Sequence, residues 1–152
     1  MTSDLVAVFP QMATEPYLPT SSATFAYNCV AHAFKDDARW WEPDPLGMYY
    51  WPIGRREKTI KAWVLLAESF GYVSCDNGNL ESGFEKIAIY ILNQRPSHIT
   101  RQLDDGTWTS KLGSCVDISH TLAGLEGTEY GRLARYLKKP KPSTGTIDNA
   151  KT

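Results

Sequence analysis

The sequence is poor in cysteine, has no long apolar run and carries almost no excess charge. Its three cysteines are too few, and odd in number, for a disulfide framework, so we expect a reducing, cytoplasmic environment. No stretch of about 18 apolar residues is present, which argues against a transmembrane helix. The first residues, MTSDLVAVFPQM, lack the basic region and the apolar stretch of a cleavable signal peptide. These features do not exclude export by a route that needs no cleavable signal.

The balance of charge limits the partners. The chain has 16 Lys and Arg residues against 17 Asp and Glu residues, a formal net charge of −1. Such a chain has no general attraction for nucleic acid or for an anionic membrane, so we expect neither as a partner. A length of 152 residues with 42% hydrophobic residues predicts one globular domain that folds without a metal or disulfides. We expect no cofactor, and the sequence leaves the oligomeric state open.

Proline and polar residues divide the chain into three parts. Residues 1–24 contain three prolines with several Ser and Thr and predict an extended lead-in. Residues 25–139 predict the folded domain. Residues 140–152 have little to bury and predict a flexible tail.

Two helices are expected early in the domain. In FAYNCVAHAFKDD, residues 25–37, Asn28 is a good N-cap and Cys29 is then the first helical residue. In REKTIKAWVLLAESFGY, residues 56–72, apolar side chains recur on one helical stripe, and Gly71 follows as a stop. The stripe consists of Ile60, Trp63, Val64, Ala67 and Phe70.

An antiparallel sheet is expected after the helices. EKIAIYILN, residues 85–93, predicts a strand that is buried on both faces. Residues 98–103 and 107–112 flank the turn signal DDG and predict a hairpin. Asp117 or Ser119 is a candidate cap for a short helix over HTLAGLEG, and YGRLARYL is compatible with a last strand or helix. Helices followed by an antiparallel sheet predict an α+β fold.

The position of Cys29 is compatible with a nucleophile. A thiol attacks as the thiolate, and the unpaired N–H groups and positive dipole end at a helix start lower its pKa. A base must then come from elsewhere in the fold. His32 lies along the same helix, which favours a structural role, and His120 is expected near the surface. His98 begins a hairpin strand and is the preferred candidate.

The order of these residues resembles the papain-like cysteine hydrolases, most closely the NlpC/P60 and CHAP group. The likeness rests on Cys29 at a helix start, on GFEKIAIY and on HITRQLDDGTWTSKLG, and covers roughly residues 25–112. It implies a papain-like α+β fold in which the Cys29 helix packs on the sheet. It also implies that Cys29 is the nucleophile, that His98 is the base, and that Ser110, or Asp117 in its place, orients the imidazole.

The same resemblance implies hydrolysis or transfer at an amide or peptide bond. The backbone N–H of Cys29, helped by Asn28 or Tyr27, would stabilise the oxyanion. The aromatic segment 39–52 predicts one wall of a substrate cleft, or else a loop folded onto the core. Five rings are candidates for this wall: Trp40, Trp41, Tyr49, Tyr50 and Trp51.

Three other interpretations of the cysteines stay open. Cys29 is compatible with an inert buried thiol, because free cysteines are among the most buried residues. Cys29 with His32, and Cys115 with His120, form a two-plus-two set that zinc accepts, which would make this a small zinc-binding protein. A non-catalytic binding module that retains the papain-like frame and the aromatic groove is the third alternative.

Overall fold

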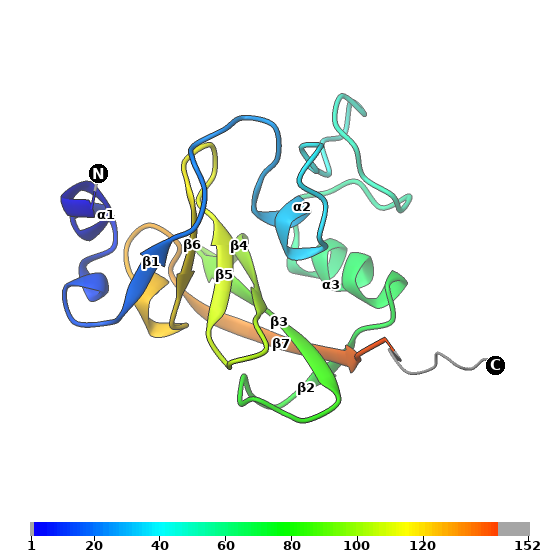
Figure 1. Ribbon diagram of the computed structural model, residues 1–152. Coiled ribbons are helices and arrows are strands. Elements are labelled where there is room, and N and C mark those ends of the chain that lie inside the picture. The colour runs from blue at the N-terminus through cyan, green and yellow to red at the C-terminus, as the bar shows by residue number, and fades with distance from the viewer. Residues whose placement is uncertain (1, 143–152) are drawn as a thin grey trace.

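A seven-stranded antiparallel sheet dominates the computed structural model, which describes residues 2–142 (Figure 1). The strand order is β1-β6-β5-β4-β3-β7-β2, and every neighbouring pair is antiparallel. The strands are β1 Tyr17–Pro19, β2 Val73–Cys75, β3 Phe84–Leu92, β4 Arg95–Gln102, β5 Trp108–Lys111, β6 Asp117–His120 and β7 Arg132–Pro140. The tail expected over residues 140–152 lies, from residue 143 onward, outside the described residues.

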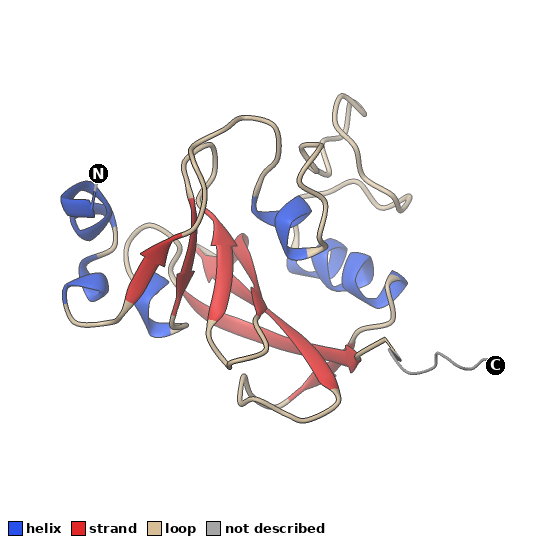
Figure 2. Cartoon of the chain, viewed as in Figure 1, coloured by secondary structure: helices blue, strands red, loops and turns tan. Residues whose placement is uncertain are grey.

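The helices are few and short (Figure 2). The α-helices are α1 Thr2–Val8, α2 Cys29–Ala33 and α3 Ile60–Ser69, and the 3-10 helices are η1 Pro10–Ala13 and η2 Ala123–Leu125. Within the described part of the chain, no helix has the length and apolarity needed to cross a bilayer.

The expected α+β papain-like fold is wrong, because the chain is mostly β. Segments expected to be helical or irregular form strands instead. Asp117 and Ser119, expected to cap a helix, belong to β6, and YGRLARYL, left open between a strand and a helix, runs into β7, which pairs with β3 along most of its length. The lead-in expected to be extended contains α1, η1 and the edge strand β1. Pairing with neighbouring strands therefore overrides the local preferences of these segments.

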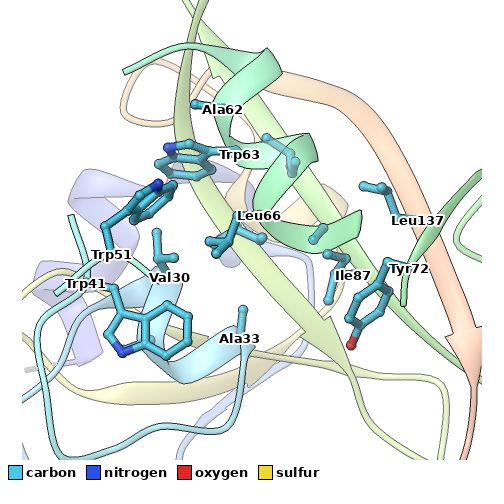
Figure 3. Close-up of a cluster of buried hydrophobic side chains, with 14 of the residues drawn as sticks. Val30, Ala33, Trp41, Trp51, Ala62, Trp63, Leu66, Tyr72, Ile87 and Leu137 are labelled. Carbon is cyan, nitrogen blue, oxygen red and sulfur yellow. The ribbon is translucent and has the colours of Figure 1, made fainter. Parts of the chain in front are cut away.

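The sheet carries a hydrophobic core on each face. The first, here called the α2-side core, contains buried side chains of α2, α3 and the aromatic segment packed on Ile87, Ile89 and Ile99 (Figure 3). The second, here called the N-terminal core, joins Leu5, Phe9 and Met12 to Tyr90, Ile118 and Leu125. Successive residues of a strand point to opposite faces, so Ile89 and Tyr90 enter different cores.

Several sequence predictions are confirmed by this structure. The strand expected over residues 85–93 is β3, whose middle is fully buried. The DDG turn joins β4 to β5, as expected of a hairpin. The second helix is α3, capped by Thr59, and Gly71 follows it with a φ of +95°, the left-handed conformation that glycine accepts most readily.

α2 begins at Cys29 because Asn28 caps it. The Asn28 side-chain oxygen accepts a hydrogen bond from the Ala31 N–H at 3.2 Å, as predicted for an N-cap. The same oxygen accepts from the Trp41 N–H, and the Asn28 amide donates to the Trp41 carbonyl at 2.7 Å. One side chain thus fixes the start of α2 and ties it to the aromatic segment.

Candidate thiol–imidazole site

Cys29 is partly exposed at the first position of α2. Desolvation raises the pKa of its thiol to about 11. The backbone N–H groups of Ile99, Val30 and Cys29 itself favour the thiolate, as does the nearby charge of Lys111, but they do not offset burial. The expectation that the helix start lowers the pKa of Cys29 is therefore wrong, and Cys29 is a neutral thiol at neutral pH.

His98 lies in β4 and is completely buried. Its Nε2 lies 2.9 Å from the Ser110 Oγ, and its ring stacks on Tyr130 with centroids 4.1 Å apart and planes 8° from parallel. Its Nδ1 is buried without a hydrogen-bond partner among the described residues. Burial, assisted by the charges of His120 and His32, lowers the pKa of His98 well below its ordinary value, so the ring is neutral.

Cys29, at the start of α2, lies close to the part of β4 that contains His98, but the two side chains are on different sides of it. The Ile99 N–H that meets the Cys29 sulfur belongs to the residue next to His98. Tyr130, which stacks on His98, is close enough to Cys29 for a thiolate there to raise its pKa. Ile99 packs in the α2-side core, whereas His98 lies against Tyr90 beside the N-terminal core. No hydrogen bond joins the Cys29 thiol to His98 in the described structure.

Near His98, side chains rather than backbone pairs connect β4 to β5. Backbone pairing between β4 and β5 is confined to Arg101 with Thr109 and Gln102 with Trp108. His98 and Ile99 lie beyond these pairs, towards the start of β4. There the contact between His98 and Ser110 connects the two strands.

Ser110 is the centre of a buried polar quartet made of His98, Thr100, Ser110 and His120. Its Oγ lies 2.7 Å from the Thr100 Oγ1 and 2.7 Å from the His120 Nε2. The four side chains come from the adjacent strands β4, β5 and β6, and each is at most 1% exposed. The structure thus places Ser110, the residue expected to orient the imidazole, against the ring of His98.

Asp117, the other candidate for orienting His98, lies in a different group. Its Oδ2 accepts a hydrogen bond from the Tyr27 hydroxyl at 2.6 Å and lies 3.9 Å from the His32 Nδ1. Burial and this hydrogen bond raise the pKa of Tyr27 to about 12. The Tyr27 hydroxyl, expected to help an oxyanion, therefore donates to a carboxylate instead.

The ligand set of the zinc hypothesis is not assembled. His32 contacts the Thr109 hydroxyl at 2.9 Å and Asp37 at 3.1 Å, Cys115 is exposed, and His120 belongs to the buried polar quartet. Across residues 2–142, no group of three or more Cys, His, Asp or Glu side chains is arranged to hold a metal ion. The surface position expected for His120 is wrong, since the residue is 1% exposed.

Cys29 lines a small cleft of about 200 Å³. Asn28, Trp41 and Glu42 line it with Cys29, and Pro96 and Ser97 contribute from β4. Trp41 and Trp51 are both buried in the α2-side core, but Trp51 does not line the cleft, and the Trp40 indole donates to Glu42. A larger hollow of about 300 Å³, lined by Lys35, Glu85 and Arg101 among others, does not include Cys29.

A family model described as a domain of unknown function, DUF7689, matches residues 19–138. The chain belongs to this family. The residues matched to DUF7689 run from the last residue of β1 into β7, so they contain Cys29, the cleft and the buried polar quartet. No curated protein and no solved structure matches the chain. Neither the DUF7689 match nor the fold supports membership of the papain-like superfamily.

Sequence reasoning did not single out Thr100 and Tyr130, and it expected His120 near the surface, whereas all three contact the buried site. Thr100 lies two residues after His98 in β4, and His120 lies two residues after Ile118 in β6, so the members of each pair point to the same face of the sheet. A correct strand assignment over residues 117–120 would therefore have placed His120 inside. The sequence contains no comparable signal for Tyr130, which lies in the turn before β7.

Proposed function

We propose that this DUF7689 protein is a cysteine hydrolase acting on an amide or related acyl bond, with Cys29 as nucleophile and His98 as base. The observation that carries the proposal is the Nδ1 of His98, which is buried without a partner while the rest of the ring is fixed by Ser110 and Tyr130. Leaving a buried polar atom unpaired costs about 1–3 kcal/mol, so such an atom requires an explanation, and a catalytic role is one that fits here. Cys29 is the nucleophile in the proposal because the backbone N–H of Ile99, the residue after His98, favours its thiolate form.

The proposed reaction starts from two neutral groups. As the Cys29 sulfur forms a bond to the carbonyl carbon, the thiol proton passes to the His98 Nδ1. When the carbon–nitrogen bond breaks, Nδ1 returns that proton to the leaving amine. Water then attacks the thioester, releasing the acid and regenerating the thiol. Hydrogen bonds between catalytic groups are often long without substrate and shorten when it binds.

The start of α2 supplies donors for the oxyanion. The N–H groups of Cys29 and Val30 face the Cys29 sulfur. The oxyanion of a tetrahedral intermediate would form next to this sulfur, within reach of these donors. The Asn28 amide already donates to the Trp41 carbonyl, so we assign Asn28 to positioning rather than to the oxyanion.

The cleft favours a compact substrate group. Its volume is below the range of about 300–1,000 Å³ that is common for drug-sized ligands. Trp41 and Pro96 supply apolar surface, and Glu42 and Lys58, paired at 3.3 Å, supply charge. We therefore propose a peptide or small amide that places one short residue beside Cys29.

An activated ester tests the chemistry directly. With p-nitrophenyl acetate, we expect an acetyl group on Cys29, located by peptide mass spectrometry, followed by its hydrolysis. His98→Gln should lower the acylation rate by about 10²–10⁴-fold, the usual contribution of a general base. Cys115→Ala, a change at an exposed thiol, should leave the rate unchanged. Acylation of Cys29 at the same rate in His98→Gln would refute the proposal.

A non-catalytic binding module is the second candidate. The neutral, desolvated thiol favours it, because Cys29 then only lines the cleft. This candidate gains support if folded protein is never acylated at Cys29 yet Cys29→Trp, which fills the cleft, abolishes binding of a peptide ligand.

A further inference from the structure

We infer that His120, acting through Ser110, holds His98 in the tautomer that carries its proton on Nε2 and leaves Nδ1 as a bare acceptor. Only the consequence of this inference, that Nδ1 is ready to accept the Cys29 proton, rests on the proposed function. The tautomer itself follows from counting the protons of the buried polar quartet. His120 and Ser110 are positioning residues in this arrangement.

The count begins at the far end of the quartet, at His120. Its Nδ1 lies 2.7 Å from the Thr121 carbonyl oxygen, which can only accept, so Nδ1 carries a proton. Burial lowers the pKa of His120 to about 4, so the ring is neutral and has no second proton. Its Nε2 is therefore an acceptor and requires a donor.

Ser110 is the donor that the His120 Nε2 requires. The Thr100 hydroxyl is 3.2 Å from this nitrogen, but it donates its one proton to the Thr109 carbonyl at 2.8 Å. The Ser110 hydroxyl lies nearer, at 2.7 Å. The Ser110 hydroxyl also donates to the Thr100 oxygen at 2.7 Å, so its proton lies on the side of these two acceptors and points away from His98.

A serine hydroxyl has one proton, so Ser110 presents only lone pairs to His98. The 2.9 Å contact between the two is then a hydrogen bond donated by the His98 Nε2–H. A neutral imidazole carries one proton, so the His98 Nδ1 is bare. The opposite choice, with Ser110 donating to His98, leaves the His120 Nε2 facing two oxygens with no proton between them. No hydrogen-bond partner of the His98 Nδ1 in the described structure opposes the first assignment.

This arrangement explains how a serine can orient the imidazole. A serine alone is free to donate to His98 or to accept from it, so it fixes neither tautomer. The bare Nε2 of His120 removes this freedom by accepting a hydrogen bond from the serine hydroxyl. His120 in β6 thus sets the state of a ring in β4, two strands away in the sheet.

Nitrogen NMR of histidine-labelled full-length protein tests the inference, because a bare and a protonated ring nitrogen have well separated shifts. We expect opposite tautomers in the wild type: a bare Nδ1 in His98 and a bare Nε2 in His120. His120→Leu should remove the bare-Nδ1 signal of His98 or average it with the other tautomer. Cys115→Ala, a change at an exposed thiol outside the quartet, should leave the His98 shifts unchanged.

Two results would overturn the inference: a protonated Nδ1 in wild-type His98, or wild-type shifts of His98 in folded His120→Leu. If His120→Leu does not fold, Ser110→Ala provides the second variant, and it should likewise release the His98 tautomer. The measurement needs no turnover. A protein with the expected tautomers that never acylates Cys29 refutes the proposed function alone, whereas His98-dependent acylation with the other tautomer refutes this inference alone.

Discussion

Burial leaves both Cys29 and His98 uncharged, by opposite shifts. It raises the pKa of the thiol to about 11 and lowers that of the imidazole. A preformed thiolate–imidazolium pair is therefore not the resting state, and in the proposed reaction the thiol proton would move during the attack. The sequence indicated the helix start correctly but not this outcome, because desolvation depends on the strands that pack against α2.

Alkylation with iodoacetamide measures this property, since it requires a preformed thiolate. At pH 8 we expect Cys29 to react about 100-fold more slowly than a thiol with a pKa near 9, because a difference of two pKa units changes the thiolate fraction by that factor. The rate should keep rising until the pH approaches about 11. Mass spectrometry of the Cys29 peptide follows the reaction, with exposed Cys115 as the internal reference for access of the reagent. A Cys29 rate that is already maximal below pH 8.5 would contradict the raised pKa.

α2 has five residues, too few to be stable without its cap and its packing on the sheet. Asn28 makes the capping hydrogen bond and two more with the Trp41 backbone while being 8% exposed. Thr59 offers a matched comparison, because it caps α3 with a bond of the same length, 3.2 Å, from the Ala62 N–H. The two caps thus differ chiefly in their connections to the rest of the protein.

We expect Asn28→Ala to lower the free energy of unfolding by about 2–4 kcal/mol, the sum of one cap and two buried hydrogen bonds. Thr59→Ala should cost about 1 kcal/mol. Urea denaturation of both variants measures the difference. Equal losses would show that the Trp41 hydrogen bonds add nothing to the cap.

The elements that the sequence predicted correctly are those with a clear internal period or a capping residue. β3 is a continuous run of apolar and β-branched residues, α3 has a regular stripe, and Asn28 marks the start of α2. β1 and β2 have three residues each, too few for a pattern. β7, RLARYLKKP, is rich in helix-forming residues and is a strand because it pairs with β3 on one side and β2 on the other.

The residues of the candidate site likewise divide into those with a local sequence signal and those without one. Cys29 and Asn28 could be found from local capping rules and His98 from its place at the start of a hairpin strand, whereas Ser110 was expected only from the resemblance to the papain-like group. His120 and Tyr130 reach the site only through long-range pairing and stacking, which a local pattern does not encode. The error in fold class came from β1, β2 and β6, which were not expected as strands, and from β7, which was left open between a strand and a helix.

The two cores make the whole chain from α1 to β7 one folded unit, including residues that precede the DUF7689 match. Leu5, Phe9 and Met12 lie before residue 19 yet are buried in the N-terminal core. Phe9 is 4% exposed, and its ring centroid lies 5.1 Å from that of Tyr130. Tyr130 in turn stacks on His98. The N-terminal segment therefore supports the candidate site from the side of the sheet opposite α2.

Phe9→Ala should lower the free energy of unfolding by about 3–5 kcal/mol, as expected when a buried aromatic side chain leaves a cavity. Val8→Ala, a change at the 42% exposed neighbouring residue, should cost less than about 0.5 kcal/mol. Chemical denaturation measures both. Because Tyr130 loses a packing partner only in Phe9→Ala, that variant should also shift the ring resonances of His98, and Val8→Ala should not. If Phe9→Ala is as stable as Val8→Ala, the residues before the family match form no part of the core.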